Sequence, residues 1–192
     1  MILILSSFLW LVFFITHSYF ADNHVKKSLI ERFNWNEQNY RFIYSLLSLI
    51  LFSSVYLVQI IDSKTMLLKG MNRLPFIGIG LILNGLIFNL LAFKNISIRE
   101  FIGLSSRKII VNELIQRGVY TIVRHPIYTG LISLFMGVFL YQPTLYNALN
   151  FGAIIIYLPI GIYLEERKLI ELYGSPYLDY RKKVKAVIPF LI

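Results

Sequence analysis

The hydrophobic positions of the chain fall into five long stretches separated by short polar segments. Three of them, 2–20, 42–61 and 74–93, contain no charged residue and are long enough to cross a hydrocarbon core of about 30 Å as helices. Two more, 127–142 and 146–164, are separated by only three residues. The pattern predicts an all-α, polytopic membrane helical bundle with about five transmembrane helices, in which the fourth and fifth spans form a tight hairpin.

The first stretch differs from a secretory signal peptide, and the fourth is shorter than the others. A secretory signal peptide would carry basic residues before its apolar stretch, whereas here Lys26 and Lys27 follow it. We therefore expect 2–20 to be a retained span. The fourth stretch is short for a full crossing, so it is expected to tilt little or to thin the bilayer locally.

The composition supports this interpretation. Of 192 residues, 57% are hydrophobic and 15% are charged, whereas a soluble domain typically has about 25% charged residues. The absence of cysteine excludes disulfides, zinc-thiolate sites and a thiol nucleophile. We expect a single domain over 1–192, in which 1–93 supplies three spans and 94–192 holds most of the polar chemistry.

The distribution of charge predicts the orientation of the spans. The chain has 19 Lys and Arg residues against 10 Asp and Glu, a net charge of +9. Segments 21–41, 94–124 and 165–192 carry 16 of the 19 basic residues, and the segments on the other side carry 3. The positive-inside rule then places the N-terminus outside and the C-terminal tail in the cytoplasm; a bacterial inner membrane is the expected location. Because the basic residues alternate with apolar spans, we do not expect nucleic acid as a partner.

Polar residues gather just before the fourth stretch, where Arg124 and His125 precede Pro126. Proline disfavours helical geometry in the preceding residue and suits the first turn of a helix, so His125 is expected at the mouth of this span. The start of that helix would favour an anion such as a carboxylate. A basic pair that only anchors the helix at the interface is the alternative interpretation.

Two carboxylates, Glu165 and Glu166, directly follow the fifth stretch. Neighbouring residues lie about 100° apart around a helix, so one carboxylate can face the bundle while the other meets water or a basic partner. A solvated helix end, with Arg167 and Glu171 paired, would also explain them. The short hairpin, however, must bring this pair close to Arg124 and His125 on one face, which favours a site.

Isolated polar residues elsewhere have weaker signals. His17 lies at the inner end of the first span, where an ionisable group is a functional hypothesis by default, although a hydrogen bond to a neighbouring helix would explain it equally well. Gly174 can end the helix that carries the Glu pair. Tyr177 and Tyr180 in the tail are expected to pack rather than to bind a ligand.

These residues carry a family resemblance over about 112–190. The pattern resembles the isoprenylcysteine carboxyl methyltransferase and phospholipid methyltransferase superfamily of integral membrane enzymes. It consists of Gly118-Val119-Tyr120, Arg124-His125-Pro126-x-Tyr128-x-Gly130, Glu165-Glu166-x-x-Leu169, Tyr173-Gly174, Tyr177, Tyr180 and Ile188-Pro189. The front of the chain, with His17-Ser18, Tyr40-Arg41 and Phe101-Ile102-Gly103-Leu104, is similar to the bacterial branch that includes methanethiol S-methyltransferases and NnrU-like proteins.

The resemblance implies a methyltransferase that binds S-adenosylmethionine on the cytoplasmic side, between the loop before the fourth span and the tail. Its implied cofactor-binding residues are Asn112, Leu114, Ile115, Tyr120, His125, Pro126, Tyr128 and one or both of Glu165 and Glu166. A carboxylate suits the sulfonium and amino groups of this cofactor, and His125, Arg124 or a helix N-terminus suits its carboxylate.

The implied chemistry is an in-line displacement that needs alignment and desolvation, without a metal. Arg124 and His125 are the candidate catalytic residues. If the acceptor is a thiol, His125 or His17 could act as a general base, whereas a carboxylate acceptor needs none.

The acceptor implied by the resemblance is a small thiol, an isoprenylcysteine-like molecule or a membrane lipid that enters sideways from the bilayer. Isoprenylcysteine enzymes carry an arginine just ahead of the Glu pair to hold the substrate, but 159–164 contains none. This departure favours a smaller or neutral thiol, or a lipid. His17 and Tyr163 are the candidate acceptor-binding residues.

Two other functions are compatible with parts of the sequence. Membrane sterol-type reductases that use NADPH share an Arg-His-Pro-like run, but their version resembles HPNYxGE, and here Ile127 and Leu131 replace its Asn and Glu. The second alternative is a non-catalytic membrane accessory protein in which the site has degenerated.

Overall fold

The computed structural model describes residues 1–60, 67–68, 73–94, 96, 98–104 and 114–189. Its contacts divide the chain into two compact units, which are considered one at a time. The first comprises Met1–Ser63 and Ile96–Ile110, and the second comprises Lys64–Asn95 and Val111–Ile192. The third predicted span therefore groups with the C-terminal spans, because it packs against the fourth.

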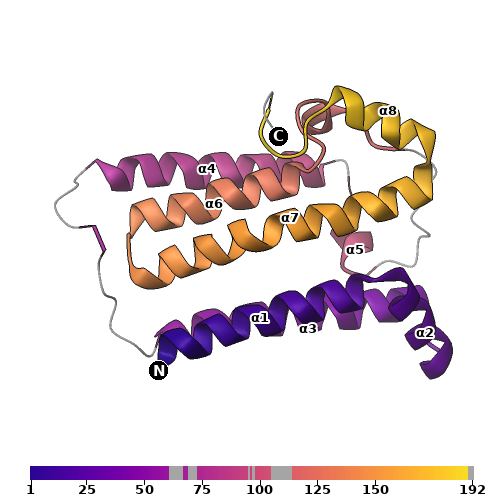
Figure 1. Ribbon diagram of the computed structural model, residues 1–192, viewed down its shortest axis with the longest axis horizontal. Helices are drawn as coiled ribbons and strands as arrows, with labels where there is room; N and C mark the ends of the chain where they lie inside the picture. Colours follow the sequence, from indigo (N-terminus) through magenta and orange to yellow (C-terminus); the bar gives the residue numbers. More distant parts are fainter. Residues whose placement is uncertain (61–66, 69–72, 95, 97, 105–113, 190–192) are drawn as a thin grey trace. The chain divides into compact units, whose positions relative to one another are not determined.

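The first unit is a pair of long helices with short additions. It contains α1 (Ile2–Ala21), α2 (Asn23–Phe33), α3 (Glu37–Ile60) and α5 (Ile98–Phe101). Helix α1 runs alongside α3 (Figure 1), and aromatic side chains fill their contact. The buried Trp10 ring stacks on Phe14 at 5.0 Å and meets the edge of Phe52 at 5.9 Å. Large side chains thus hold this pair together.

Helix α2 is an element that the apolar pattern does not predict. The side chain of Asp22 caps its start by accepting hydrogen bonds from the backbone N–H groups of His24 and Val25. Asn34, in the left-handed conformation, ends it. Both residue types are typical of these positions, so the capping residues were the available signal.

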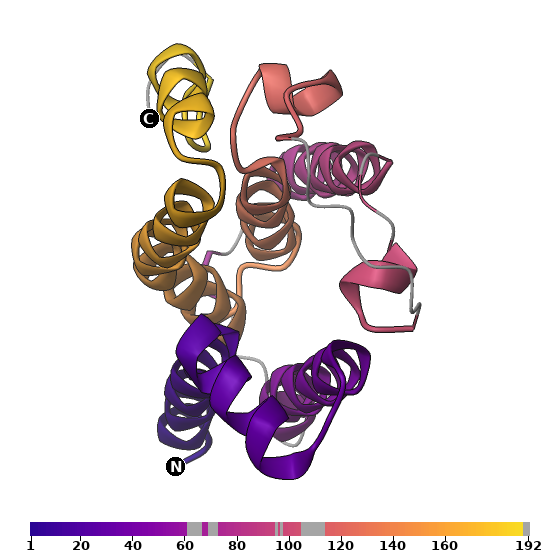
Figure 2. The same ribbon diagram turned by 90° about the vertical axis from the view of Figure 1, so that its right-hand side faces the viewer.

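The second unit is built from three long helices and a folded-back tail. It contains α4 (Leu74–Phe93), the 3₁₀ helix η1 (Gly118–Thr121), α6 (Pro126–Tyr141), α7 (Leu145–Tyr173) and α8 (Ser175–Lys183). Helix α6 lies between α4 and α7, as Figure 2 shows in a view along the helices.

Glycines bring α4 and α6 into close backbone contact. A Cβ atom added at Gly85 would lie 2.6 Å from the carbonyl oxygen of Gly130, and one added at Gly137 would lie 2.8 Å from that of Gly78. The hydroxyl of Ser133 also donates to the carbonyl of Leu81 at 2.9 Å. Small and hydroxyl residues are typical of such membrane helix interfaces, and this one fixes α6, at whose start His125 lies.

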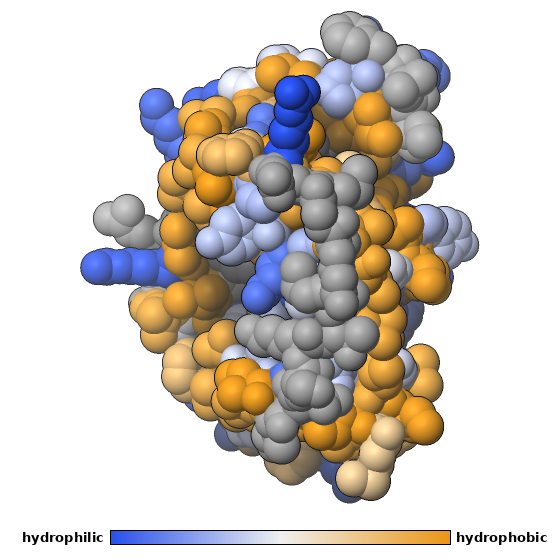
Figure 3. Space-filling view, turned by 90° about the vertical axis from the view of Figure 1, so that its left-hand side faces the viewer, coloured by the Kyte–Doolittle hydropathy of each residue, from blue (hydrophilic) through white to orange (hydrophobic). Residues whose placement is uncertain are grey.

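The helices agree with the predicted spans. Helices α1, α3, α4 and α7 are long and apolar enough to cross a membrane, and α6 is a shorter apolar helix of 16 residues. Many of their side chains are exposed and hydrophobic, and hydrophobic residues cover much of the face in Figure 3. The prediction of a polytopic helical bundle is confirmed. Helix α7 extends to Tyr173, well beyond the end of its apolar stretch.

Candidate functional site

His125 lies between the two carboxylates that the sequence predicted to be its neighbours. Its backbone forms the N-cap of α6, with Pro126 as the first helical residue. The buried imidazole places Nδ1 3.5 Å from Glu165 Oε2 and Nε2 3.3 Å from Glu166 Oε1. The tight hairpin between α6 and α7 therefore brings the histidine and the Glu pair together, as expected.

This arrangement favours the protonated form of His125. Burial alone would lower its pKa, but hydrogen bonds and the negative charges of Glu165 and Glu166 outweigh burial and raise the pKa above its ordinary value. Because each ring nitrogen faces a carboxylate oxygen, the imidazolium ion can donate to both of them. The ring holds the two carboxylates on either side of it.

The two carboxylates have different surroundings. The Glu166 side chain is 8% exposed, and its Oε1 accepts from Arg124 Nε at 3.0 Å and Nη2 at 2.5 Å. Its other oxygen, Oε2, lies 3.1 Å from Nε of Arg181. The Glu165 side chain, in contrast, is 46% exposed. Glu166 is thus the inward-facing member, bound to the chain's own cations, and Glu165 faces outward.

The C-terminal tail is attached directly to the loop that carries His125. Backbone N–H groups of Arg124 and His125 donate to the carbonyls of Lys185 and Ala186, at 2.8 and 2.9 Å. The two N–H groups that precede α6 are therefore occupied by the chain itself. A ligand at this helix start would meet a surface already covered in part by the tail.

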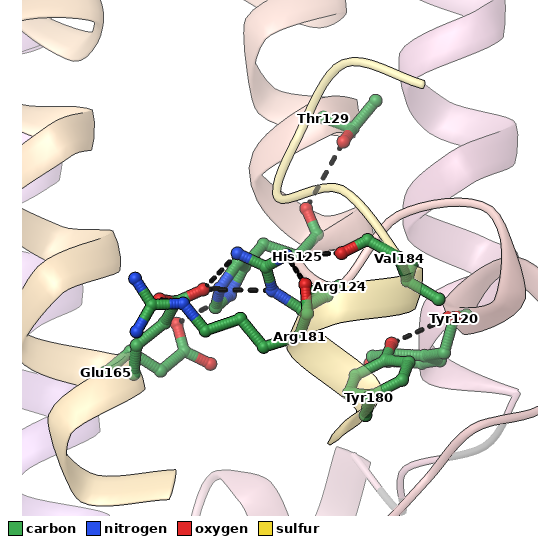
Figure 4. A network of polar contacts seen from close by, with 9 residues as sticks. Tyr120, Arg124, His125, Thr129, Glu165, Tyr180, Arg181 and Val184 are labelled. Carbon is green, nitrogen blue, oxygen red and sulfur yellow. Dashed lines mark hydrogen bonds and ion pairs between the residues drawn. The ribbon is translucent and has the colours of Figure 1, made fainter. Parts of the chain in front are cut away.

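Side chains strengthen this attachment. Arg124 Nη1 donates to the carbonyl of Arg181 at 3.1 Å and to that of Val184 (Figure 4). The Thr129 hydroxyl donates to the carbonyl of Val187 at 2.7 Å. With only 9% of its side chain exposed, Arg124 has little surface left for a ligand. Its role as a catalytic residue stays a prediction, whereas its contacts are those of a residue that joins the tail to Glu166.

Two tail tyrosines pack as the sequence analysis expected. Tyr177 and Tyr180 are both buried, and the Tyr180 hydroxyl donates to the carbonyl of Tyr120 at 2.6 Å. Burial raises the pKa of Tyr180 above its ordinary value, so the hydroxyl keeps its proton at neutral pH. This bond joins α8 to η1 on the side of the network away from Glu165 (Figure 4).

The structure describes most of the other predicted cofactor-binding residues. The Tyr128 ring centroid is 5.6 Å from that of His125, and Pro126 is buried at the start of α6. Burial and the charge of Glu165 raise the pKa of Tyr120 to about 12. Leu114 and Ile115 are half-buried in the segment before η1. Asn112 lies outside the described residues.

The two candidate acceptor-binding residues are less closely related to the site. Tyr163 is exposed on α7, two residues before Glu165. His17 belongs to the first unit, where its Nδ1 lies 2.9 Å from the Tyr44 hydroxyl and 3.2 Å from that of Ser48. Hydrogen bonding to a neighbouring helix, one of the two interpretations of His17, is thus observed.

Arg181 is the residue of this network that the sequence analysis did not identify. It lies 15 positions after Glu166 and reaches that carboxylate only because the chain reverses at Gly174, where φ is 62°. Gly174 was the available signal in the sequence. It predicted the end of the helix, but it did not predict the direction in which the tail continues. Among the described residues, no three His, Asp or Glu side chains are grouped so as to hold a metal ion.

Comparisons with known proteins identify relatives of this part of the chain. The model of the phospholipid methyltransferase family matches residues 74–176, which includes η1, α6, the Glu pair and Gly174. Methanethiol S-methyltransferase 1 of Bradyrhizobium diazoefficiens is 42% identical over 74 residues, 38% of this chain and 25% of the relative. The methanethiol S-methyltransferase of Pseudomonas deceptionensis is 36% identical over 73 residues, 38% of this chain and 27% of the relative. The matched part of the chain thus spans about a quarter of the length of these curated relatives.

Proposed function

The chain belongs to the phospholipid methyltransferase family, and we propose that it uses S-adenosylmethionine to methylate a small thiol at the surface of the membrane. The observation that carries the proposal is the outward-facing Glu165 carboxylate, 46% exposed beside the buried His125. A membrane lipid is the second acceptor class, because the family is named for phospholipid methylation. The relatives named as methanethiol S-methyltransferases support the thiol.

The charges of the site fit such a methyl donor. S-adenosylmethionine carries a sulfonium ion and an amino group, both cationic, together with one carboxylate. Glu165 is placed to bind a cation, since its carboxylate is 46% exposed, with His125 and Tyr128 as its hydrogen-bond partners. Glu166 does not compete for the ligand, because both its oxygens already accept from arginine. We therefore assign cation binding to Glu165 and a positioning role to Glu166.

When bound, the donor would supply a methyl group on a positively charged sulfur; a thiolate aligned behind the methyl carbon would bond to it while the carbon–sulfur bond to the donor breaks and S-adenosylhomocysteine leaves. The residues of the chain would orient and desolvate the reactants. His125 can accept a thiol proton only as a neutral imidazole, which requires that one of its two carboxylate contacts be given up. In the fully bonded arrangement His125 is a hydrogen-bond donor that orients the Glu pair.

The protein is an integral membrane protein, and we propose that the site lies on its cytoplasmic side. The support is the charge distribution, since 16 of 19 basic residues fall in 21–41, 94–124 and 165–192, the segments that the predicted spans place on one side. A reporter enzyme that works only in the cytoplasm should be active when it is fused to the C-terminus. Activity of a reporter that works only outside the cytoplasm would contradict this orientation.

The function can be tested with purified protein in detergent and S-adenosylmethionine labelled in its methyl group. We expect label to pass to methanethiol and not to phosphatidylethanolamine, and we expect no calorimetric binding of NADPH. Label in the phospholipid would replace the thiol by the lipid as the acceptor. NADPH binding without donor binding would support a reductase, and binding of neither would contradict any enzymatic role at this site.

A matched pair of variants tests the role of Glu165. Glu165→Gln removes the accessible negative charge at the site, whereas Glu171→Gln removes one from the same helix, where Glu171 pairs with Arg167 at 3.6 Å. Transfer should fall in the first variant and persist in the second. Equal transfer in both would contradict the assignment of Glu165.

A further inference from the structure

Two arginines contact opposite oxygens of Glu166, and they differ in accessibility. Arg124 binds Oε1 through two nitrogens, and its side chain is 9% exposed. Arg181 binds Oε2 through Nε at 3.1 Å, and its side chain is 49% exposed. Arg124 is therefore enclosed by the chain, whereas Arg181 offers half its surface to a ligand.

The geometry of the Arg181 contact leaves donors for another anion. A guanidinium group has five N–H donors in a planar fork, of which the Nε contact with Glu166 uses one. The two terminal nitrogens are the pair that binds a carboxylate in the bidentate arrangement typical of arginine. Glu166 thus fixes the guanidinium and leaves its terminal N–H groups available as donors.

Arg181 and Glu165 lie on the same side of the network. Figure 4 shows the Arg181 side chain reaching from α8 toward α7, on the side where Glu165 lies and away from Tyr120 and Tyr180. His125 and Glu166 connect the two residues. Glu165 contacts His125, His125 contacts Glu166, and Glu166 contacts Arg181. A half-exposed carboxylate and a half-exposed guanidinium are therefore presented together.

This juxtaposition matches the charges of an α-amino acid, whose amino group is cationic and whose carboxylate is anionic. We propose that Arg181 binds the α-carboxylate of the methyl donor while Glu165 binds its α-amino group. The proposal rests on the proposed function. It makes the tail a part of the donor site and assigns Arg181 rather than Arg124 to the donor carboxylate.

The attachment of the tail explains how Arg181 is kept in place. The carbonyl of Arg181 accepts from Arg124 Nη1 at 3.1 Å, and the backbone beyond α8 is bonded to the loop before α6. Arg124 therefore positions both the carboxylate of Glu166 and the backbone of Arg181. An arginine whose backbone and Nε are already held by hydrogen bonds loses less conformational freedom on binding an anion than a freely moving arginine does.

The test compares two donors on two proteins by calorimetry in detergent. The donors are S-adenosylmethionine and decarboxylated S-adenosylmethionine, which lacks only the α-carboxylate. Wild-type protein should bind the complete donor about 10- to 100-fold more tightly than the decarboxylated one, the range of a charge-assisted hydrogen bond. In Arg181→Gln this preference should disappear, because the complete donor loses affinity and the decarboxylated donor does not.

Arg167→Gln is the matched control. Arg167 is 50% exposed, close to the 49% of Arg181, and it pairs with Glu171 on the outer part of α7. This variant should keep the wild-type preference for the complete donor. The ratio of the two affinities within one protein does not depend on the fraction that is folded, so partial unfolding of a variant cannot mimic the result.

The outcomes separate this inference from the function on which it rests. If wild-type protein binds neither donor, the proposed function fails. If wild-type protein binds both and Arg181→Gln keeps the preference for the complete donor, only the assignment of Arg181 is overturned. Equal weakening of both donors in Arg181→Gln would also overturn it, because that pattern indicates a purely structural role.

Discussion

Each unit contains a partly or fully buried histidine, and the two histidines have different partners. His17, between α1 and α3, contacts the hydroxyls of Tyr44 and Ser48 and stacks between Phe13 and Tyr44, with ring centroids 5.4 and 5.2 Å away. His125 lies between two carboxylates instead. Hydroxyl partners satisfy an imidazole, whereas a pair of carboxylates also changes its charge. The partners of a histidine in a membrane protein, more than its burial, thus indicate its chemistry.

The helix contacts of the two units also differ. In the first unit, the rings of Trp10 on α1 and Phe52 on α3 meet edge to face. In the second unit, glycines bring the backbones of α4 and α6 together. Close backbone packing is thus found at α6, the helix that begins directly after His125.

The largest loss of stability in the second unit is expected from Glu166→Ala. The substitution leaves Arg124 and His125 buried without their shared carboxylate, and removal of one partner of a buried ion pair costs about 3–5 kcal/mol. The unfolding midpoint in detergent should fall strongly. Glu171→Ala removes an exposed pair worth about 0.3–0.5 kcal/mol and should change the midpoint little. Similar midpoints in the two variants would show that the buried network does not stabilise the second unit.

A smaller loss is expected where the backbones of α4 and α6 meet. Gly85→Ala would place a Cβ atom 2.6 Å from the carbonyl oxygen of Gly130, and overpacking of this kind costs about 1–3 kcal/mol. Gly80 lies in the same helix with no atom within 4 Å of an added Cβ. Thermal unfolding should therefore separate Gly85→Ala from Gly80→Ala, and an unchanged midpoint for Gly85→Ala would refute close packing.

The smallest effect concerns the charge of His125. Its pKa is raised in the folded protein, so its protonation stabilises the fold fully below the unfolded pKa of about 6.5. That contribution is lost as the pH rises through the folded pKa. The unfolding midpoint should consequently decline with rising pH above about 6.5, and the decline should be shallower in His125→Gln. The same substitution at His24 measures the effect of removing a histidine elsewhere, and identical pH profiles for both variants would argue against a charged His125.

The sequence predicted the elements that depend on long apolar runs. Helix α4 has the predicted bounds, α1 is one residue longer at its end, and α6 begins and ends one residue earlier than its predicted stretch. Helix α7 extends nine residues past its apolar stretch, because Glu166 and Arg167 find partners and a helix can continue outside the lipid. The charged residues mark the end of the predicted span, but helix α7 continues past them.

The site was predictable in part. The short hairpin was sufficient to place His125 beside Glu165 and Glu166, and helix geometry predicted that the two carboxylates would face different ways. Which of them faces inward could not be predicted, since it depends on Arg181 and the tail. The pairing of 185–186 with 123–125 uses backbone groups, which leave no side-chain pattern in a sequence.

The most direct test of the account is the affinity of Glu165→Gln for S-adenosylmethionine, measured by calorimetry beside wild-type protein and Glu171→Gln. If the outward-facing carboxylate binds the donor, Glu165→Gln should bind about 10-fold or more weakly, as expected for loss of a charged hydrogen bond, and Glu171→Gln should bind like wild-type protein. Equal affinity of all three proteins would contradict the central claim that Glu165 holds the methyl donor.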